Sequence, residues 1–147
     1  MTAIEVSLAR DDDATAVREL VAANADPFDV DMELARRYAR VWVARRDTQI
    51  LGVALTWEVA DEIHIIDVLV AAAARRQGLG RALLREILEQ AARGPFRLAL
   101  LEVRRDNQPA RGLYESLGFV VVGEREKYYA DGEDAVLMRR ALSPADP

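Results

Sequence analysis

A stretch rich in arginine and glycine, set between an apolar run and a helical pattern, constrains the fold of this chain most. Residues 75–80 read Arg-Arg-Gln-Gly-Leu-Gly, after the apolar run at 63–70 and before an amphipathic stretch at 81–93. This order predicts a strand, a short loop and a helix. The start of a helix leaves partially positive N–H groups without carbonyl partners, and glycine lets the backbone approach an anion with no Cβ in the way. We therefore interpret this stretch as a cradle for a phosphate group.

A second cluster, about one strand later, carries a carboxylate and a phenol. Glu102 stands between Leu101 and Val103, and Asn107 and Tyr114 follow it. The apolar neighbours favour a partly buried carboxylate. A lone Gly-x-Gly after a strand is often only a tight turn, so this second cluster is what makes the cradle informative.

Length and charge narrow the class of ligand. A chain of 147 residues, half of them apolar, can bury one core and predicts a single domain. The 25 acidic and 20 basic residues give a net charge of −5, which argues against a general binder of nucleic acid or anionic membrane. Arg75, Arg76 and Arg81 still form a short basic patch. We expect the partner to be a small polyanion.

The absence of cysteine excludes several kinds of chemistry. Disulfides, thiolate metal sites and a cysteine nucleophile are all impossible, and the single histidine leaves few metal options, so we expect no metal. The first ten residues lack the basic segment and apolar stretch of a secretion signal, and no apolar run is long enough to cross a bilayer. We predict a soluble cytoplasmic protein.

Hydrophobic periodicity predicts alternating strands and helices. We expect strands at 4–8, 41–44, 50–59, 63–70, 96–103, 119–122 and 135–140, and helices at 11–23, 32–40, 81–93 and 109–117. Residues 24–31 are predicted as a loop, and a polar tail follows the last strand. The run at 96–103 alternates little, which is typical of a central strand covered on both faces. The order predicts an α/β fold with a mixed sheet.

The cradle also resembles a known motif. Arg75-x-x-Gly78-x-Gly80 is similar to the Q/R-x-x-G-x-G/A acetyl-coenzyme A motif of the GNAT N-acetyltransferases. Residues 101–119 and 125–135 resemble the RimI-like branch of that superfamily, which acetylates the N-terminal amine of a ribosomal protein. The match is densest from 63 to 140 and weak before 41. The resemblance implies the GNAT fold, a mixed and mostly antiparallel sheet flanked by helices, with splayed central strands.

The resemblance also implies roles for individual residues. It makes acetyl-coenzyme A the acetyl donor, Glu102 the general base and Tyr114 the general acid. A main-chain N–H near Val70 is the expected oxyanion donor. The donor site would comprise the backbone of Val68, Leu69 and Val70 beside the pantetheine arm, Arg75, Arg76, Gln77, Gly78, Leu79, Gly80 and Arg81 around the pyrophosphate, and Asn107.

Two departures from the family pattern concern neighbouring positions. Many members have proline at the Ala72 position and a polar or aromatic residue at the Ala74 position. Asp67 stands where RimI-like proteins commonly have asparagine. The first departure leaves the phosphate loop intact, whereas the second concerns the identity of the acceptor.

The chemistry of acetyl transfer explains these residue types. A terminal amine has a pKa near ~8, so it is mostly protonated at neutral pH and must lose a proton before it attacks a thioester. Glu102 could accept that proton directly or through water. Tyr114 could protonate the departing thiolate. With no cysteine to carry an acyl group, the transfer is expected to be direct.

Other residues have competing interpretations. His64 or Asp67 could be the base in place of Glu102. A single strand histidine is more often structural, and strand alternation puts Asp67 on the opposite face from His64. Asn107 could simply cap the following helix. Tyr128 and Tyr129 could form an acceptor groove or pack the last hairpin.

Tryptophans and paired arginines have plainer interpretations. Trp42 and Trp57 are expected in the core or at an interface. The pairs Arg36-Arg37 and Arg45-Arg46 are most simply solvated faces.

Three functions are compatible with these observations. The principal hypothesis is an N-acetyltransferase for the N-terminal α-amine of a protein. The second keeps the donor but changes the acceptor to a small amine, such as an amino acid, a polyamine or an amine drug. The third is a regulatory module that binds acyl-coenzyme A without transferring it.

Overall fold

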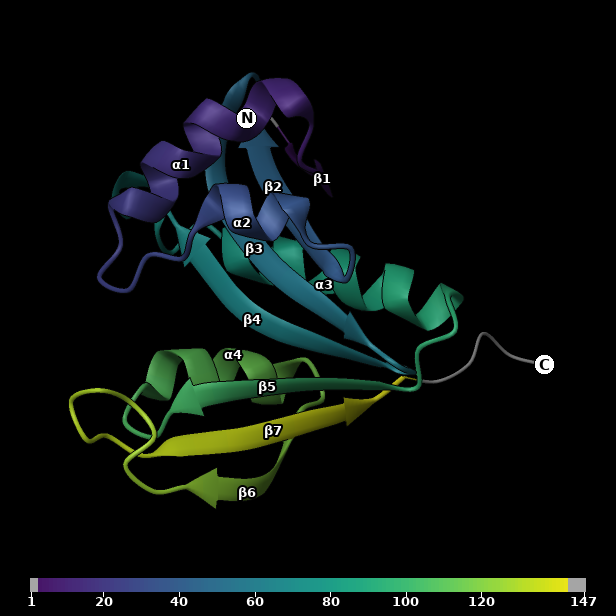
Figure 1. Ribbon diagram of the computed structural model, residues 1–147, viewed down its shortest axis with the longest axis vertical. Helices are drawn as coiled ribbons and strands as arrows, with labels where there is room; N and C mark the ends of the chain where they lie inside the picture. The colour runs from purple at the N-terminus through teal and green to yellow at the C-terminus, as the bar shows by residue number, and fades with distance from the viewer. Residues whose placement is uncertain (1–2, 143–147) are drawn as a thin grey trace. The chain divides into compact units, whose positions relative to one another are not determined.

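The computed structural model describes residues 3–142 and divides the chain into two compact units. The first unit comprises the residues up to Glu58 together with Ile66–Ile87, and the second comprises Val59–Ile65 together with the residues from Leu88 onward. The prediction of a single domain stays a prediction. Figure 1 labels the helices and strands.

The elements alternate as the periodicity predicted. The strands are β1 (Ile4–Leu8), β2 (Ala39–Arg46), β3 (Gln49–Val59), β4 (Glu62–Val70), β5 (Leu98–Arg104), β6 (Val120–Arg125) and β7 (Ala135–Ala141). The helices are α1 (Ala14–Ala22), α2 (Val30–Ala35), α3 (Leu79–Arg93) and α4 (Gln108–Ser116), with short 3-10 turns at Asp11–Asp13 and Ala72–Ala74. The predicted polar tail lies mostly outside the described residues.

The strands form one mixed sheet in the order β1-β2-β3-β4-β5-β7-β6. β1 with β2, β2 with β3, β5 with β7 and β6 with β7 are antiparallel pairs. β4 and β5 are parallel, and their register runs from Glu62 opposite Leu98 to Ile65 opposite Leu101. Both strands continue beyond this short ladder, as the splayed central strands of the predicted fold require.

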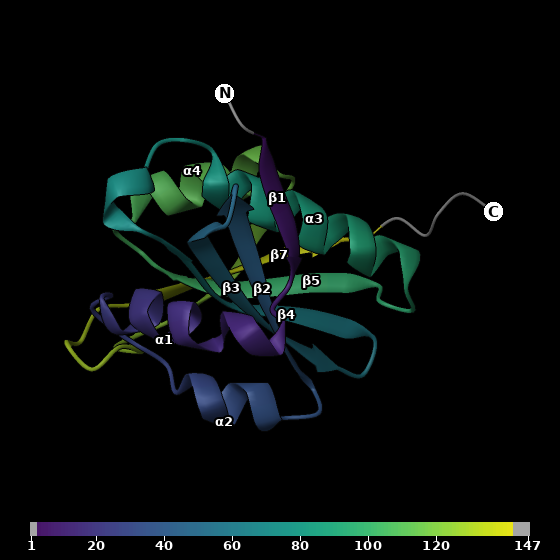
Figure 2. The ribbon, with the colours of Figure 1, turned by 90° about the horizontal axis from the view of Figure 1, so that it is seen from above.

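Helices cover both faces of the first unit's strands. α1 and α2 lie on one face, where Val17, Leu20, Val21 and Val30 pack with Val41, Val43, Val53 and Leu55. The beginning of α3 lies on the other face, because a Cβ at Gly52 would come 3.1 Å from Leu83 Cδ1. Figure 2 shows α1 and α2 together on one side of β2 and β3. The amphipathic pattern predicted at 81–93 is confirmed, because Leu83, Leu84 and Ile87 are buried.

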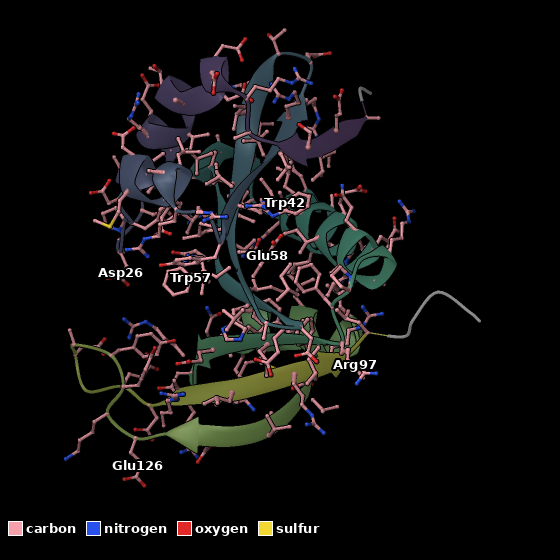
Figure 3. The ribbon with its side chains drawn as sticks, turned by 45° about the vertical axis from the view of Figure 1, so that its right-hand side comes forward. Asp26, Trp42, Trp57, Glu58, Arg97 and Glu126 are labelled. Atoms are coloured by element: carbon pink, nitrogen blue, oxygen red, sulfur yellow. The ribbon has the colours of Figure 1, made fainter. Side chains whose placement is uncertain are left out.

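The two tryptophans lie on opposite faces of the first unit (Figure 3). Trp42 is buried, and its Nε1–H donates to Thr56 Oγ1 at 3.0 Å. Trp57 is half-buried and donates to Glu33 Oε1 at 2.8 Å, which explains why the Glu33 carboxylate can be buried. Both indole N–H groups are therefore satisfied, and both rings pack as the sequence predicted.

The second unit contains the neighbouring strands β5, β7 and β6 (Figure 1). Along the chain, α4 follows β5 and precedes β6. Its core contains Ala99, Leu101, Val103, Phe119, Val136 and Met138. α4 ends at Ser116, and Gly118, two residues later, has a φ of 93°. A side chain there would be strained, and its Cβ would also meet Arg140 Nε at 3.1 Å.

The prediction of a helix at 32–40 was wrong in extent. α2 begins at Val30 and ends at Ala35, because Asp29 caps it by accepting a hydrogen bond from the Met32 N–H at 3.0 Å. Residues from Ala39 onward instead join β2, where Ala39 pairs with Trp57. Tertiary pairing outweighed the helical spacing of this segment.

Two further expectations were wrong. β5 is not covered on both faces: Ala99, Leu101 and Val103 are buried, whereas the side chains between them are only half-buried. Arg45 is not on a solvated face either, because its side chain is 11% exposed and pairs with Asp13 at 2.9 Å. Periodicity alone could not show that the 3-10 turn brings a carboxylate to that arginine.

No helix within residues 3–142 is both long enough and apolar enough to span a bilayer. In the same part of the chain, no three histidine or carboxylate side chains come together as a metal site.

Candidate active site

The loop between β4 and α3 has the backbone shape of an anion cradle. Arg76 has a φ of 64° and Gly78 a φ of 82°, so two left-handed residues alternate within one short turn. Such alternation points successive N–H groups into one concavity. Arg75, Arg76, Gln77 and Gly78 are all exposed.

α3 begins directly after this turn, two residues earlier than predicted. Its first internal hydrogen bond runs from the Ala82 N–H to the Gly78 carbonyl at 3.0 Å. The N–H groups of Leu79 and Gly80 precede that bond, so the helix offers them no carbonyl. Leu79 itself is 1% exposed and anchors the turn in the core. The cradle is therefore anchored by the buried Leu79 side chain, while residues 75–78 remain exposed to solvent.

Arg46 is a residue of the cradle that the sequence did not reveal. It lies at the end of β2, and its Nη1–H donates to Gln77 Oε1 at 2.7 Å. A fourth arginine thereby stands beside Arg75, Arg76 and Arg81. Only the pairing of β2 with β3 and the folding of the cradle bring it there, so we found no signal in the sequence that predicts it.

The end of β4 supplies the remaining predicted donor residues of the first unit. Val68, Leu69 and Val70 are half-buried, and the Ala71 N–H donates to the Leu51 carbonyl at 2.8 Å. A cavity of about 480 Å³ opens beside the strand end, and Val70 and Arg75 are among the residues that line it. The strand end is thus fixed on one side and accessible on the other.

We expect Gly78→Ala to weaken binding of coenzyme A. No atom lies within 4 Å of the position of its Cβ, so the cost comes from the left-handed φ of 82° alone. That strain is about 1 kcal/mol, which corresponds to roughly a five-fold higher Kd if the loop relaxes. Calorimetric titration with coenzyme A measures it.

Gly132→Ala is the matched control for this variant. Gly132 has a φ of 86° and also has no atom within 4 Å of its Cβ position, but it lies in the loop between β6 and β7. The two variants carry the same backbone strain. Equal Kd values for coenzyme A in both would show that the conformation of Gly78 does not matter for binding.

Asp67 carries the most perturbed carboxyl group of the first unit. Burial raises its pKa to about 6, the negative charge of Asp26 adds to the shift, and a hydrogen bond with the Val68 backbone opposes it. Asp26 lies in the segment between α1 and α2 (Figure 3). A carboxyl with this pKa can exchange a proton near neutral pH, so Asp67 stays a rival base.

His64 is engaged within its own strand. Its Nε2 lies 2.9 Å from Glu62 Oε1, and the two side chains are about one third exposed. They stand two residues apart on the same face of β4. This contact supports the structural interpretation of His64.

In the second unit, Glu102 lies on the half-buried face of β5. Arg125 Nε is 3.9 Å from its Oε1, and the hydroxyl of Tyr128 donates a hydrogen bond to the carboxylate. That hydrogen bond is also the main reason that the pKa of Tyr128 is raised. Oε2 is buried and has no hydrogen-bond partner. One lobe of the carboxylate can therefore accept a proton without breaking an existing contact.

Tyr114 lies in α4, and Asn107 directly precedes the helix. The ring of Tyr114 packs edge-on against Phe119, with 5.9 Å between the centroids, and its side chain is half-buried. The Asn107 side chain accepts a hydrogen bond from the Ala110 N–H at 3.2 Å, so the interpretation of Asn107 as a helix cap is confirmed. Its predicted contact with the donor stays a prediction.

Comparison with known proteins supports the family and the fold that the cradle and the sheet indicate. The sequence model of the acetyltransferase (GNAT) family matches residues 9–119. This chain belongs to that family. GNAT acetyltransferases take the acetyl group from acetyl-coenzyme A, so the chain is an acetyl-coenzyme A-dependent N-acetyltransferase, as predicted.

Individual relatives lie in the RimI-like branch. The chain is 41% identical over 93 residues to the ribosomal protein bS18-alanine N-acetyltransferase of Escherichia coli (strain K12), a segment that covers 61% of this chain and 63% of that protein. It is 49% identical over 80 residues to the N-alpha-acetyltransferase RimI of Mycobacterium tuberculosis, over 54% of this chain and 48% of that protein. Each segment spans less than two thirds of the relative.

A solved structure extends the likeness to the whole fold. The crystal structure of the ribosomal-protein-S18-alanine N-acetyltransferase from Escherichia coli superposes with a TM-score of 0.87 at 30% identity, over 98% of this chain and 97% of that one. The predicted GNAT fold and the predicted RimI-like resemblance are both confirmed.

The first unit of this GNAT protein fits the diphosphate of its donor. The turn from Arg75 to Gly80 presents exposed arginines and N–H groups that the helix does not use, and its conformation is set by Gly78. These are the groups that bind phosphate at helix starts.

Proposed function

We propose that this GNAT protein transfers the acetyl group of acetyl-coenzyme A to the N-terminal α-amine of a protein, with a ribosomal protein of the bS18 type as substrate. The observation that carries this choice of acceptor is the match to the Escherichia coli bS18-alanine acetyltransferase, which extends over 98% of the chain. A cytoplasmic location follows from this substrate.

The donor is held by the first unit. The N–H groups at the start of α3 and the side chains of Arg75, Arg76 and Arg81 bind the diphosphate, and the backbone of Val68, Leu69 and Val70 aligns the pantetheine arm. A main-chain N–H near Val70 donates to the thioester oxygen as it becomes negative. Binding energy from the remote diphosphate thus orients the reacting carbonyl.

The second unit supplies the base. The acceptor ammonium first loses one proton to Glu102, which passes it to solvent, and the neutral nitrogen then forms a bond to the thioester carbon. The nitrogen gives a second proton to Glu102 as the tetrahedral intermediate collapses to the amide. Oε2 is the oxygen that receives the proton, since it is buried and accepts no hydrogen bond. Tyr128 and Arg125 hold the carboxylate while it does so. Glu102 then returns the proton to solvent.

Tyr114 completes the transfer. The carbon–sulfur bond breaks as the tetrahedral intermediate collapses, and the electron pair leaves on sulfur. The Tyr114 hydroxyl protonates that thiolate, so free coenzyme A is released as a thiol. The phenol then recovers a proton from solvent, and no residue carries an acyl group at any stage.

An acceptor screen tests the proposal. We expect acetyl transfer to a peptide with the N-terminal sequence of a bS18 protein to have a kcat/KM at least about a hundred-fold above that for amino acids, polyamines or amine drugs, because only a peptide offers groups that bind beyond the amine. Mass spectrometry of the peptide locates the acetyl group.

The same peptide with a blocked α-amine and a free lysine is the control. If lysine or a small amine were acetylated as fast as the peptide α-amine, the protein N-terminus would be rejected as the specific acceptor, and the small-amine hypothesis would be favoured. Binding of coenzyme A without transfer to any acceptor would favour a regulatory module instead.

A further inference from the structure

One arginine of the second unit organises the loop between β6 and β7. Nη1 of Arg104 lies 2.8 Å from Asp131 Oδ2 and 2.8 Å from Glu133 Oε1. Its guanidinium carbon is 4.2 Å from the centre of the Tyr129 ring. A single side chain on β5 therefore binds three residues of a loop that is distant in sequence.

The base of the loop is closed separately. The Arg105 N–H donates to the Asp134 carbonyl at 3.0 Å, and the Lys127 N–H donates to Asp134 Oδ1 at 2.9 Å. Between these contacts the loop turns back on itself, with a bond of 2.8 Å from the Gly132 N–H to the Tyr129 carbonyl. Lys127 and Gly132 have φ values of 50° and 86°. Such a strained turn persists only where surrounding contacts hold it.

The loop reaches the proposed base. Tyr128, next to the stacked Tyr129, donates its hydrogen bond to Glu102, and Arg104 stands two residues after Glu102 on the same face of β5. The charges of Arg104, Glu102 and Glu133 all act on the Tyr129 hydroxyl, whose pKa is raised chiefly by burial. Base, loop and arginine therefore form one continuous cluster.

We propose that Arg104 is a positioning residue of the acetyl-transfer site: it holds the β6–β7 loop on β5, and the loop holds Tyr128 on the carboxylate of Glu102. The proposal rests on the assignment of Glu102 as base. Arg104 touches no reacting atom in this account. It keeps one oxygen of Glu102 occupied by the Tyr128 hydroxyl, which leaves Oε2 as the carboxylate oxygen without a hydrogen-bond partner.

The charges around Glu102 add a second consequence. Arg104 and Arg125 are the cations of the cluster, and Asp131 and Glu133 are its further acids. Removing the charge of Arg104 leaves two uncompensated carboxylates near Glu102. Like charges disfavour ionisation of a neighbouring carboxyl, so we expect the acidic limb of the pH–rate profile to move to higher pH in this variant.

The first experiment compares Arg104→Gln with Arg105→Gln. Arg105 is the next residue, 53% exposed, and its ion pairs with Glu124 and Asp134 are longer, at 3.6 and 3.5 Å. We expect Arg104→Gln to lower kcat by about ten-fold or more, because small misplacements of reacting groups cost one to two orders of magnitude. The KM for acetyl-coenzyme A should stay within about two-fold. Arg105→Gln should change neither.

Hydrogen exchange separates positioning from a general loss of structure. Amides of residues 126–134 should exchange faster in Arg104→Gln, while those of β5 and β7 keep their protection. Arg104→Lys retains the charge but loses the planar fork and its stacking on Tyr129, so it should restore the acidic limb of the pH profile without restoring kcat.

Distinct outcomes overturn the two proposals. An unchanged kcat in Arg104→Gln, or a lower kcat with unchanged exchange in the loop, contradicts the positioning role. Full turnover of Glu102→Gln contradicts instead the assignment of Glu102 as general base. The triple variant with Arg104→Gln, Asp131→Asn and Glu133→Gln removes all three charges. If kcat recovered in this variant, the balance of charge alone would explain the effect of Arg104→Gln, and the positioning role of Arg104 would be rejected.

Discussion

Glu102→Gln will lower kcat by about a hundred-fold or more at neutral pH, with little change in the affinity for coenzyme A. General base catalysis by a positioned side chain contributes about 10² to 10⁴ in rate, and glutamine cannot accept a proton. The substitution is nearly isosteric, so Tyr128 can still donate to the amide oxygen. Steady-state rates between pH 6 and pH 9 measure the effect, and thermal unfolding confirms that the fold is intact.

The pH dependence distinguishes the base from its rival. With Glu102→Gln, the remaining rate should follow deprotonation of the amine itself and rise steadily with pH. Asp67→Asn is the parallel variant, since Asp67 has a raised pKa of about 6. Were Asp67 the base, that variant would lose turnover and Glu102→Gln would retain it, and the assignment would pass to Asp67.

Arg45→Met will lower the free energy of unfolding by about 3 kcal/mol, because removing one partner of a buried ion pair leaves the other charge buried. The side chains of Arg45 and Asp13 are 11% and 8% exposed, and their shortest contact is 2.9 Å. Methionine replaces the aliphatic stem but not the charge. Asp13 keeps a hydrogen bond of 2.8 Å from the Arg10 N–H, which limits the loss. Urea denaturation measures the change.

A surface pair provides the control. Arg18 and Asp31 form a contact of 2.7 Å, but their side chains are 47% and 66% exposed. Arg18→Met should therefore change the free energy of unfolding by less than about 0.5 kcal/mol. If Arg18→Met lowered the free energy of unfolding as much as Arg45→Met, burial of the Arg45–Asp13 pair would not explain its contribution to stability.

Acidification should reduce the difference between wild type and Arg45→Met. The Arg45 guanidinium lowers the pKa of Asp13 below its ordinary value of 3.8. A lowered pKa in the folded state means that the ionised carboxylate stabilises the protein above pH 3.8 and that this stabilisation disappears as the pH falls through the lower folded value. Denaturation at pH 7 and pH 3 measures both differences.

Local patterns were sufficient where a residue's neighbours in sequence decide its conformation. The amphipathic stretch at 81–93 predicted α3, and the helix predicted at 109–117 matches α4 to within one residue at each end. The segment at 32–40 shows the limit, because pairing with β3 drew Ala39 and its neighbours into a strand. A helical spacing over nine residues is too weak to oppose a full ladder of hydrogen bonds.

The candidate site divides in the same way. Gly78 and the arginines beside it are adjacent in sequence, so the cradle could be predicted from its motif. Arg46 and the Arg104 cluster could not, because each joins residues that are 27 to 31 positions apart. Nothing local to Arg104 distinguishes it from the exposed Arg105.

The order of residues alone determined the family and the donor and predicted the residue types for proton transfer, because the motif at 75–80 and the segment around Glu102 are contiguous and their chemistry depends on residue identity. The folded chain decided which arginines are buried or paired, which oxygen of Glu102 lacks a hydrogen-bond partner and which loop contacts the carboxylate. These properties depend on distance and on exclusion of water, and both arise only when β5, β7 and the loop between β6 and β7 pack together.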